Sequence, residues 1–405
     1  MNLHHFSMPA LVVTLAVAPA VASRESSASG QDAEAGGVRD VRDVTLGPAI
    51  NLDGVMVYPL LARSHGSGSR PAPPGRLDRV DMLSTAVAER LARLVEAPDG
   101  TVAVFNDSRN HIFVPAGQIL RGGSQDRVVV YDALVPPGDE PVALALLSVE
   151  QGRQDLPGAP LAAPDEIADA PVRRSATLQQ SQEGVWAATR KALEASGTAS
   201  PTERYPSPLL WSEPWLSRAL QWVRDGLAGY PQVVGLALGF DGRFQVADLF
   251  RDPALFRAGT GALVDSYVLY ARLLVLEKPR PEDTALSGFD LQRFLLGVET
   301  AAAPRLGPGT RLTLLRSTVD AAIVELRCWD ETLVRVTALA GRAKLRELSL
   351  RDPTPPKPPR DPEGGGRASR RERRPPPPDV VAPRSRSTPP SRPAPAPPSR
   401  RGGGS

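Results

Sequence analysis

The chain has 405 residues, 41% of them hydrophobic, and a formal net charge of only +3. This apolar content suffices for one large or two ordinary domains. Much of the arginine excess lies beyond Asp352, so the body has no basic stripe for nucleic acid. The single cysteine, Cys328, excludes an intrachain disulfide and a thiolate metal cage, and only four histidines are present. We therefore expect neither a metal nor a cofactor.

Residues 1–22 resemble a signal peptide. An apolar run from residue 8 ends in Ala20-Val21-Ala22, an A-x-A cleavage pattern before Ser23. We therefore expect a secreted or periplasmic protein, although the residues before the run lack Lys and Arg. A misassigned start or a buried helix is the alternative interpretation. No later segment is expected to form a transmembrane helix.

Residues 23–43 are rich in Ser, Ala, Gly and acidic residues and are expected to be a disordered linker. An α+β domain is expected over 44–350, with a β-rich first part over 44–153. The pattern there predicts a helix over 82–94 and strands over 55–61, 101–105, 111–114, 127–131 and 142–147. The connections are too short for parallel crossovers, so they favour an antiparallel core, a sandwich or a barrel.

A helical and hairpin part is expected over 172–350. The pattern predicts helices over 176–195, 215–223 and 253–276, and hairpins over 233–250 and 322–337. The fold class is therefore α+β, with an antiparallel β-rich core, packed helices and disordered ends. Residues 352–405 are rich in Pro and Arg and are expected to be an extended, disordered tail. Such a tail is either a solvated extension or a contact to an anionic envelope polymer.

Five polar residues lie at the ends of two of the predicted strands. Gly122-Gly123 precedes Gln125, Asp126 and Arg127, and Glu150 and Arg153 follow the strand over 142–147. Neighbours on a strand point to opposite faces, so Asp126 and Arg127 each need another partner. We call Gln125, Asp126, Arg127, Glu150 and Arg153 the polar cluster and expect it at one sheet edge. It is either a site for a small anionic ligand or a salt-bridge network that fixes strand register.

Common catalytic and nucleotide motifs are absent from the sequence. Gly122-Gly123 is not followed by Lys-Ser/Thr, and there is no G-x-G-x-x-G, so the two glycines predict a bulge or tight turn. There is no G-x-S-x-G, and His111 in an apolar strand is interpreted as structural. We therefore assign no catalytic residue and interpret Cys328 as a core thiol.

The segments that contain the polar cluster resemble motifs of a bacterial family, the ARG and rhodanese-phosphatase-superfamily-associated protein domain. The resemblance covers about residues 45–280 and depends most on G-G-x-Q-[DN]-R over 122–127 and V-E-x-G-R over 149–153. Members usually have Lys, Cys and Trp where this chain has Ser124, Ser148 and Gln154. If that lysine serves a ligand, this chain lacks the cation. The family name describes genomic association, so the resemblance implies no particular reaction.

Three hypotheses for function follow. The leading one is an exported, non-enzymatic binding or accessory domain whose polar cluster binds a small anion or fixes the core. The second is a hydrolase-like enzyme for a phosphorylated or nucleotide-derived substrate, with Glu150 or Asp126 as acid or base and Arg127 and Arg153 as anion clamps. The third is an envelope interaction protein that acts through its cationic tail. None of them involves nucleic acid.

Overall fold

A computed structural model describes the chain from Val38 to Gly341 with internal gaps. The described ranges are 38–63, 79–153, 159–279, 285–302, 310–317, 319, 321–328 and 332–341. The expected signal peptide, the linker up to residue 37 and the Pro/Arg-rich tail lie outside these ranges. Ordered structure begins before the predicted boundary at residue 44, because Val38 and Val41 are buried and Val41–Asp43 forms the 3-10 helix η1. The side chains of Asp40 and Asp43 cap this turn reciprocally.

A nine-stranded antiparallel sheet is the largest element of the described chain. Its order is β1-β3-β14-β15-β19-β18-β17-β16, and β2 pairs with β3 at the side. The strands are β1 Val44–Leu46, β2 Ile50–Leu52, β3 Val55–Ala62, β14 Val233–Phe240, β15 Arg243–Phe250, β16 Gly297–Ala302, β17 Thr310–Ser317, β18 Ala321–Cys328 and β19 Leu333–Ala340. The two predicted hairpins are confirmed as β14–β15, which turns at Asp241-Gly242, and β18–β19.

Three smaller sheets form the β-rich part. Their orders are β10-β7-β4, β11-β6-β5 and β12-β9-β8-β13. The strands are β4 Val80–Met82, β5 Ala92–Glu96, β6 Val102–Asn106, β7 His111–Val114, β8 Ile119–Gly123, β9 Arg127–Val129, β10 Ala133–Val135, β11 Gly138–Leu144, β12 Leu146–Ser148 and β13 Ala159–Ala162. Among the described strands, pairing is antiparallel as predicted, except that β4 runs parallel to β7.

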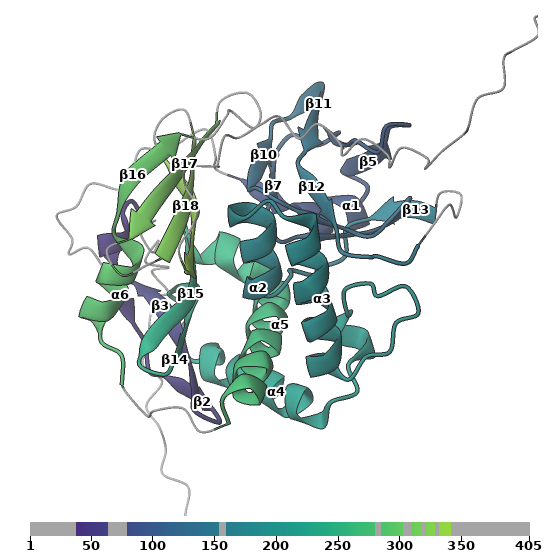
Figure 1. The fold of residues 1–405 in the computed structure, drawn as a ribbon. Coiled ribbons are helices and arrows are strands. Elements are labelled where there is room, and N and C mark those ends of the chain that lie inside the picture. The colour runs from purple at the N-terminus through teal and green to yellow at the C-terminus, as the bar shows by residue number, and fades with distance from the viewer. Residues whose placement is uncertain are drawn as a thin grey trace, which may run out of the picture. The chain divides into compact units, whose positions relative to one another are not determined.

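Helices cover both faces of the large sheet, as Figure 1 shows. They are α1 Leu83–Ala88, α2 Ala170–Arg173, α3 Gln182–Ser196, α4 Pro214–Ala228, α5 Pro253–Glu277 and α6 Gly288–Leu295, with a π-helix η2 at Arg174–Leu178 and a 3-10 turn η3 at Pro208–Leu210. The long helix α5 packs on β14, while α6 lies on the opposite face near β15. Successive residues of β3 show this division. Val57 packs in the core on the α5 side of the sheet, and Tyr58 packs in the core on the α6 side.

Two predicted helices are wrong in extent. The helix expected over 82–94 ends at Ala88, and the chain turns through Arg90 in the left-handed region, with φ of 60°, into β5. Antiparallel pairing of β5 with β6 overrides the local helical spacing there. The helix expected over 176–195 is divided into η2 and α3, because Ser181 caps a new helix by accepting a hydrogen bond from the Gly184 N–H at 3.0 Å.

One helix of the described chain, α5, is long and apolar enough by length and composition alone to cross a bilayer. However, 67% of its most apolar 18-residue stretch is buried inside the fold. Its tyrosines also bond within the core, since the Tyr267 hydroxyl lies 2.8 Å from the Leu236 carbonyl oxygen. These contacts are typical of a core helix.

Candidate functional site

The turn between β8 and β9 brings the first residues of the polar cluster together. Gly122 and Gly123 both have left-handed backbones, with φ of 89° and 61°, so the predicted tight turn is confirmed. A side chain at Gly123 would meet Glu96, because a Cβ there would lie 2.4 Å from Glu96 Oε2. The pairing of Leu120 with Arg127 places Arg121 opposite Asp126. Both glycines are therefore needed for the turn that positions Asp126.

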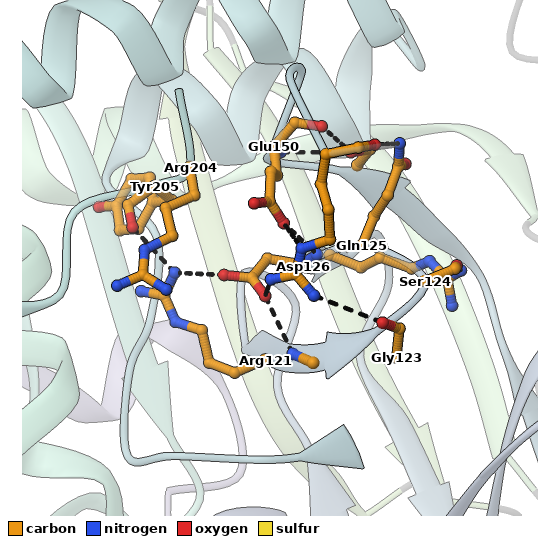
Figure 2. Close-up of polar contacts among 12 residues, drawn as sticks. Arg121, Gly123, Ser124, Gln125, Asp126, Glu150, Arg204 and Tyr205 are labelled. Atoms are coloured by element: carbon orange, nitrogen blue, oxygen red, sulfur yellow. Dashed lines mark hydrogen bonds and ion pairs between the residues drawn. The ribbon is translucent and has the colours of Figure 1, made fainter. Parts of the chain in front are cut away.

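Asp126 lies at the centre of the site, as Figure 2 shows. Its Oδ1 accepts hydrogen bonds from the Gly122 N–H at 2.9 Å and from Arg153 Nη2 at 3.1 Å. Its Oδ2 accepts one from Arg121 Nη1 at 2.9 Å. The side chain is only 1% exposed. The carboxylate is therefore buried and bonded through both oxygens.

Glu150 and Arg153 join Asp126, as the sequence predicted. Glu150 Oε2 accepts a hydrogen bond from the Asp126 N–H at 3.1 Å and lies 2.9 Å from Arg153 Nε. The Val149 N–H donates to the Asp126 carbonyl oxygen at 3.0 Å. Gln125 lies at the edge, where its Nε2 is 3.4 Å from the Arg153 carbonyl oxygen. These contacts connect the segment after β12 to the β8–β9 turn.

Arg127 does not take part in this group, which corrects the predicted network. Arg127 Nη2 bonds instead to Glu96 on β5 and to the Ser124 hydroxyl, and the Ser124 hydroxyl also donates to Glu96 Oε1 at 2.6 Å. Burial acts to raise the pKa of Glu96, but the hydrogen bonds from Ser124 and Arg127 outweigh it and lower the pKa. Asp126 and Arg127 thus have different partners, as residues on opposite faces of a strand require.

Arg121 replaces Arg127 as the second guanidinium of the group. Besides Asp126, it contacts Glu166 through Nε at 3.0 Å and the Tyr205 carbonyl oxygen through Nη1 at 2.8 Å. The Ser207 hydroxyl donates to Glu166 Oε1 at 2.7 Å. Sequence reasoning missed Arg121, although the hairpin register around Gly122-Gly123 would have placed it opposite Asp126. We call Arg121, Asp126, Glu150, Arg153 and Glu166 the Asp126 centre.

The charge of the Asp126 centre does not favour an anion. Two guanidiniums face three carboxylates, which leaves a formal charge of −1. The side chains of Arg121 and Arg153 are only 17% and 12% exposed, and their guanidiniums are already bonded to carboxylates. A second anion would therefore compete with carboxylates that the fold has placed there.

A second charged network lies deeper and was missed by sequence reasoning. Asp248 on β15 accepts two hydrogen bonds from Arg173 Nη1, at 2.9 and 3.0 Å, and one from Arg335 Nη2 at 2.6 Å. Arg335 Nη1 also donates to Asp132 Oδ1 at 2.8 Å. These four residues are at most 1% exposed, and we call them the core network. The sequence signal for it was the single charge that Asp248 and Arg335 each place among the apolar residues of a predicted strand.

The core network keeps its charges by pairing. Burial acts to raise the pKa of Asp248, but the positive charges of Arg173 and Arg335 outweigh it and lower that pKa. The Thr337 hydroxyl donates to Asp248 Oδ1 at 2.8 Å, and the Tyr267 hydroxyl lies 3.0 Å from Oδ2. Helices α2 and α5 and strand β19 therefore each supply a donor to the Asp248 carboxylate, which is the arrangement of a structural ion network.

Other predicted residues have structural surroundings. Cys328 is buried, as expected of a core thiol. His111 is partly buried at the start of β7, and burial lowers its pKa. Within the described ranges, no group of three His, Cys, Asp or Glu side chains is arranged to hold a metal ion.

Fold and site together define an antiparallel α+β domain in which arginine–carboxylate networks connect the strands to the helices and loops. The chain matches the model of the ARG and Rhodanese-Phosphatase-superfamily-associated Protein domain over residues 43–339 and belongs to that family. The resemblance found in the motifs at residues 122–127 and 149–153 is thereby confirmed. Neither the comparison with curated proteins nor the comparison with solved structures found a match.

Proposed function

We propose that this chain is an exported, non-enzymatic binding or accessory domain in which the polar cluster holds the fold together. The observation that supports this role is the state of Asp126, which is 1% exposed and bonded through both oxygens. An acid or base must reach the proton that it transfers. Glu150 is also 1% exposed and is paired with Arg153. The hydrolase alternative therefore has less support from the geometry.

The structural role is tested with Asp126→Asn and Glu150→Gln. Removing one partner of a buried ion pair leaves the other uncompensated, so we expect each variant to lose about 2–4 kcal/mol of unfolding free energy. The control is Asp107→Asn, which breaks the exposed pair between Arg93 and Asp107. Chemical denaturation of the full chain measures all three.

A catalytic site would give the opposite result. Glu150→Gln would then keep or raise the stability and abolish hydrolysis of a phosphate ester such as p-nitrophenyl phosphate. Under our proposal, any hydrolysis is equal in the wild type and in Glu150→Gln. A loss of hydrolysis without a loss of stability would refute the structural role.

Export rests on the apolar run that ends in Ala20-Val21-Ala22. Expression of the full chain in a bacterial host with an intact secretion pathway tests it. We expect the exported protein to begin at Ser23, as read by N-terminal sequencing. Retention of the intact N-terminus in the cytoplasm would contradict the proposal.

A further inference from the structure

A cavity of about 290 Å³ lies among η2, α3 and α5, and it shares no residue with the polar cluster. Helix α3 packs against both η2 and α5, and α3 and α5 lie side by side in Figure 1. Arg174, Ser175 and Gln179 line the cavity from the η2 segment, Lys191 from α3, and Tyr270 from α5. We call it the Arg174 pocket.

The π-helix places two of these residues on one side. The Gln179 N–H donates to the Arg174 carbonyl oxygen at 3.2 Å, five residues back in the chain. In an α-helix, residues five apart point in directions that differ by about 140°, since each residue turns about 100°. The wider turn brings Arg174 and Gln179 to the same pocket instead. Single π-turns are often found at functional sites.

Arg174 carries a charge that no carboxylate of the described chain neutralises by an ion pair. Its Nε is buried and has no hydrogen-bond partner in the part of the chain that the structure describes. The other cation of the pocket, Lys191, is paired with Glu277 at 2.9 Å. The lining therefore has a formal charge of +1, located at Arg174. A guanidinium partly removed from water is stabilised by an oxyanion, which can accept two of its N–H groups.

Neutral donors surround Arg174. Ser175 is only 8% exposed, and its hydroxyl makes no hydrogen bond to another residue in the described part of the chain. Tyr270 interacts with Arg174, and burial raises the pKa of Tyr270 although the charge of Arg174 acts to lower it. The hydroxyl of Tyr270 therefore stays protonated at neutral pH and can donate a hydrogen bond.

The remaining wall is apolar and limits the size of a ligand. Pro171, Ala187, Ala188 and Leu273 form it. At about 30 Å³ for each water molecule, the cavity has room for about ten non-hydrogen atoms. An oxyanion at Arg174 would leave the rest of a small molecule against this wall.

We propose that the Arg174 pocket binds a small ligand with one oxyanion group, a carboxylate or a phosphate, on a short apolar body. The oxyanion accepts hydrogen bonds from Arg174, Ser175 and Tyr270, and the apolar body lies against Ala187 and Leu273. This inference gives the proposed binding domain a site and a class of ligand, and in that respect it rests on the proposed function.

The test uses the full chain and three probes: butanoate, inorganic phosphate and the neutral butan-1-ol. Titration calorimetry should give dissociation constants of about 1–10 mM for at least one of the anions, which is typical for ligands of this size. Arg174→Gln should weaken that binding by about tenfold to a hundredfold, since it removes a charge-assisted hydrogen bond. Butanoate alone would indicate carboxylates, and phosphate alone would indicate phosphate monoesters.

Two further variants separate the pocket from general charge effects. Arg190→Gln removes the cation next to Lys191 on α3, but Arg190 is exposed and bonds to Gln151 at 2.9 Å outside the pocket. It should leave anion binding unchanged. Ala187→Leu fills the cavity from an exposed position and should weaken butanoate binding without changing the charge.

The proposal is overturned if neither anion binds, if Arg174→Gln binds as tightly as the wild type, or if Arg190→Gln weakens binding equally. It is also overturned if butan-1-ol binds as tightly as butanoate. These outcomes leave the stability losses expected for Asp126→Asn untouched, so failure of the pocket is distinguishable from failure of the proposed function.

Discussion

At the scale of single residues, buried carboxylates in this protein differ in how far their hydrogen-bond and charge partners offset the effect of burial on the pKa. Asp248 faces two guanidiniums, and its pKa is lowered despite complete burial. Asp169 is equally buried, but its closest contacts are the Val172 N–H at 3.0 Å and the Tyr205 hydroxyl at 3.3 Å. Burial therefore dominates and raises the pKa of Asp169 to about 6. The local partners decide the direction of the shift.

Asp169 should make stability depend on pH. Its folded pKa lies above the ordinary value, so the folded state binds the proton more tightly than the unfolded state does. The stabilisation from this proton is complete below about pH 4 and is lost as the pH rises towards 6. Asp169→Asn keeps an acceptor for the Val172 N–H but does not titrate. Between pH 4 and pH 7, the unfolding free energy of the variant should therefore rise by about 2 kcal/mol relative to that of the wild type.

Denaturant titrations of the wild type and Asp169→Asn at both pH values measure this difference. A difference in unfolding free energy that is the same at pH 4 and pH 7 would show that Asp169 does not titrate in this window.

At the scale of elements, close approach of backbones determines where glycine is required. A Cβ on Gly235 in β14 would lie 2.1 Å from the Asp248 carbonyl oxygen and 3.0 Å from the Leu249 Cα. The neighbouring strand β15 cannot move away without disturbing its own pairing with β19. Gly235 thus holds in register the strand that carries Asp248.

Gly235→Ala should lower the unfolding free energy by about 1–3 kcal/mol or more, as overpacking does. The matched control is Gly229→Ala at the end of α4, where no heavy atom lies within 4 Å of the added Cβ. Gly229 has a right-handed backbone, with φ of −81°, so this control should be neutral or stabilise by about 0.4–1 kcal/mol. Thermal unfolding of both variants compares them, and equal effects would contradict the steric explanation.

At the scale of the whole domain, the core network connects parts that are distant in the chain. Arg335 on β19 joins the large sheet to Asp132, which follows β9 in the β-rich part, and to Asp248 on β15. Arg173 adds helix α2 to the same carboxylate. The sheet, the helices and the β-rich part therefore share one buried electrostatic centre.

Arg335→Met should lower the unfolding free energy by about 3–5 kcal/mol, because Asp132 loses its guanidinium and Asp248 loses one of two. Arg93→Met is the control, since Arg93 pairs with Asp107 at the exposed surface, where the loss of an ion pair has little effect on stability. Urea denaturation measures both. A loss for Arg335→Met no larger than that of the control would mean that the network does not stabilise the domain.

Much of the fold was predictable because its signals are local. The turn at Asp241-Gly242, the hairpin β18–β19 and the long helix α5 follow from turn residues and apolar periodicity. The predictions failed where pairing with a distant segment overrides local preference. Residues 92–94 have helical spacing, yet they form β5 because β6 supplies a partner strand.

The sequence by itself determined the fold class, the family, the glycine turn at residues 122–123 and the grouping of Asp126 with Glu150 and Arg153. Only the tertiary structure decided that Arg127 pairs with Glu96, that Arg121 takes the place beside Asp126 predicted for Arg127, and that Asp248 pairs with Arg335. The physical reason is the distance along the chain over which each interaction acts. Backbone preferences act over a few residues, whereas an ion pair joins side chains whose separation in the chain, 87 residues for Asp248 and Arg335, is bridged only by strand register and packing.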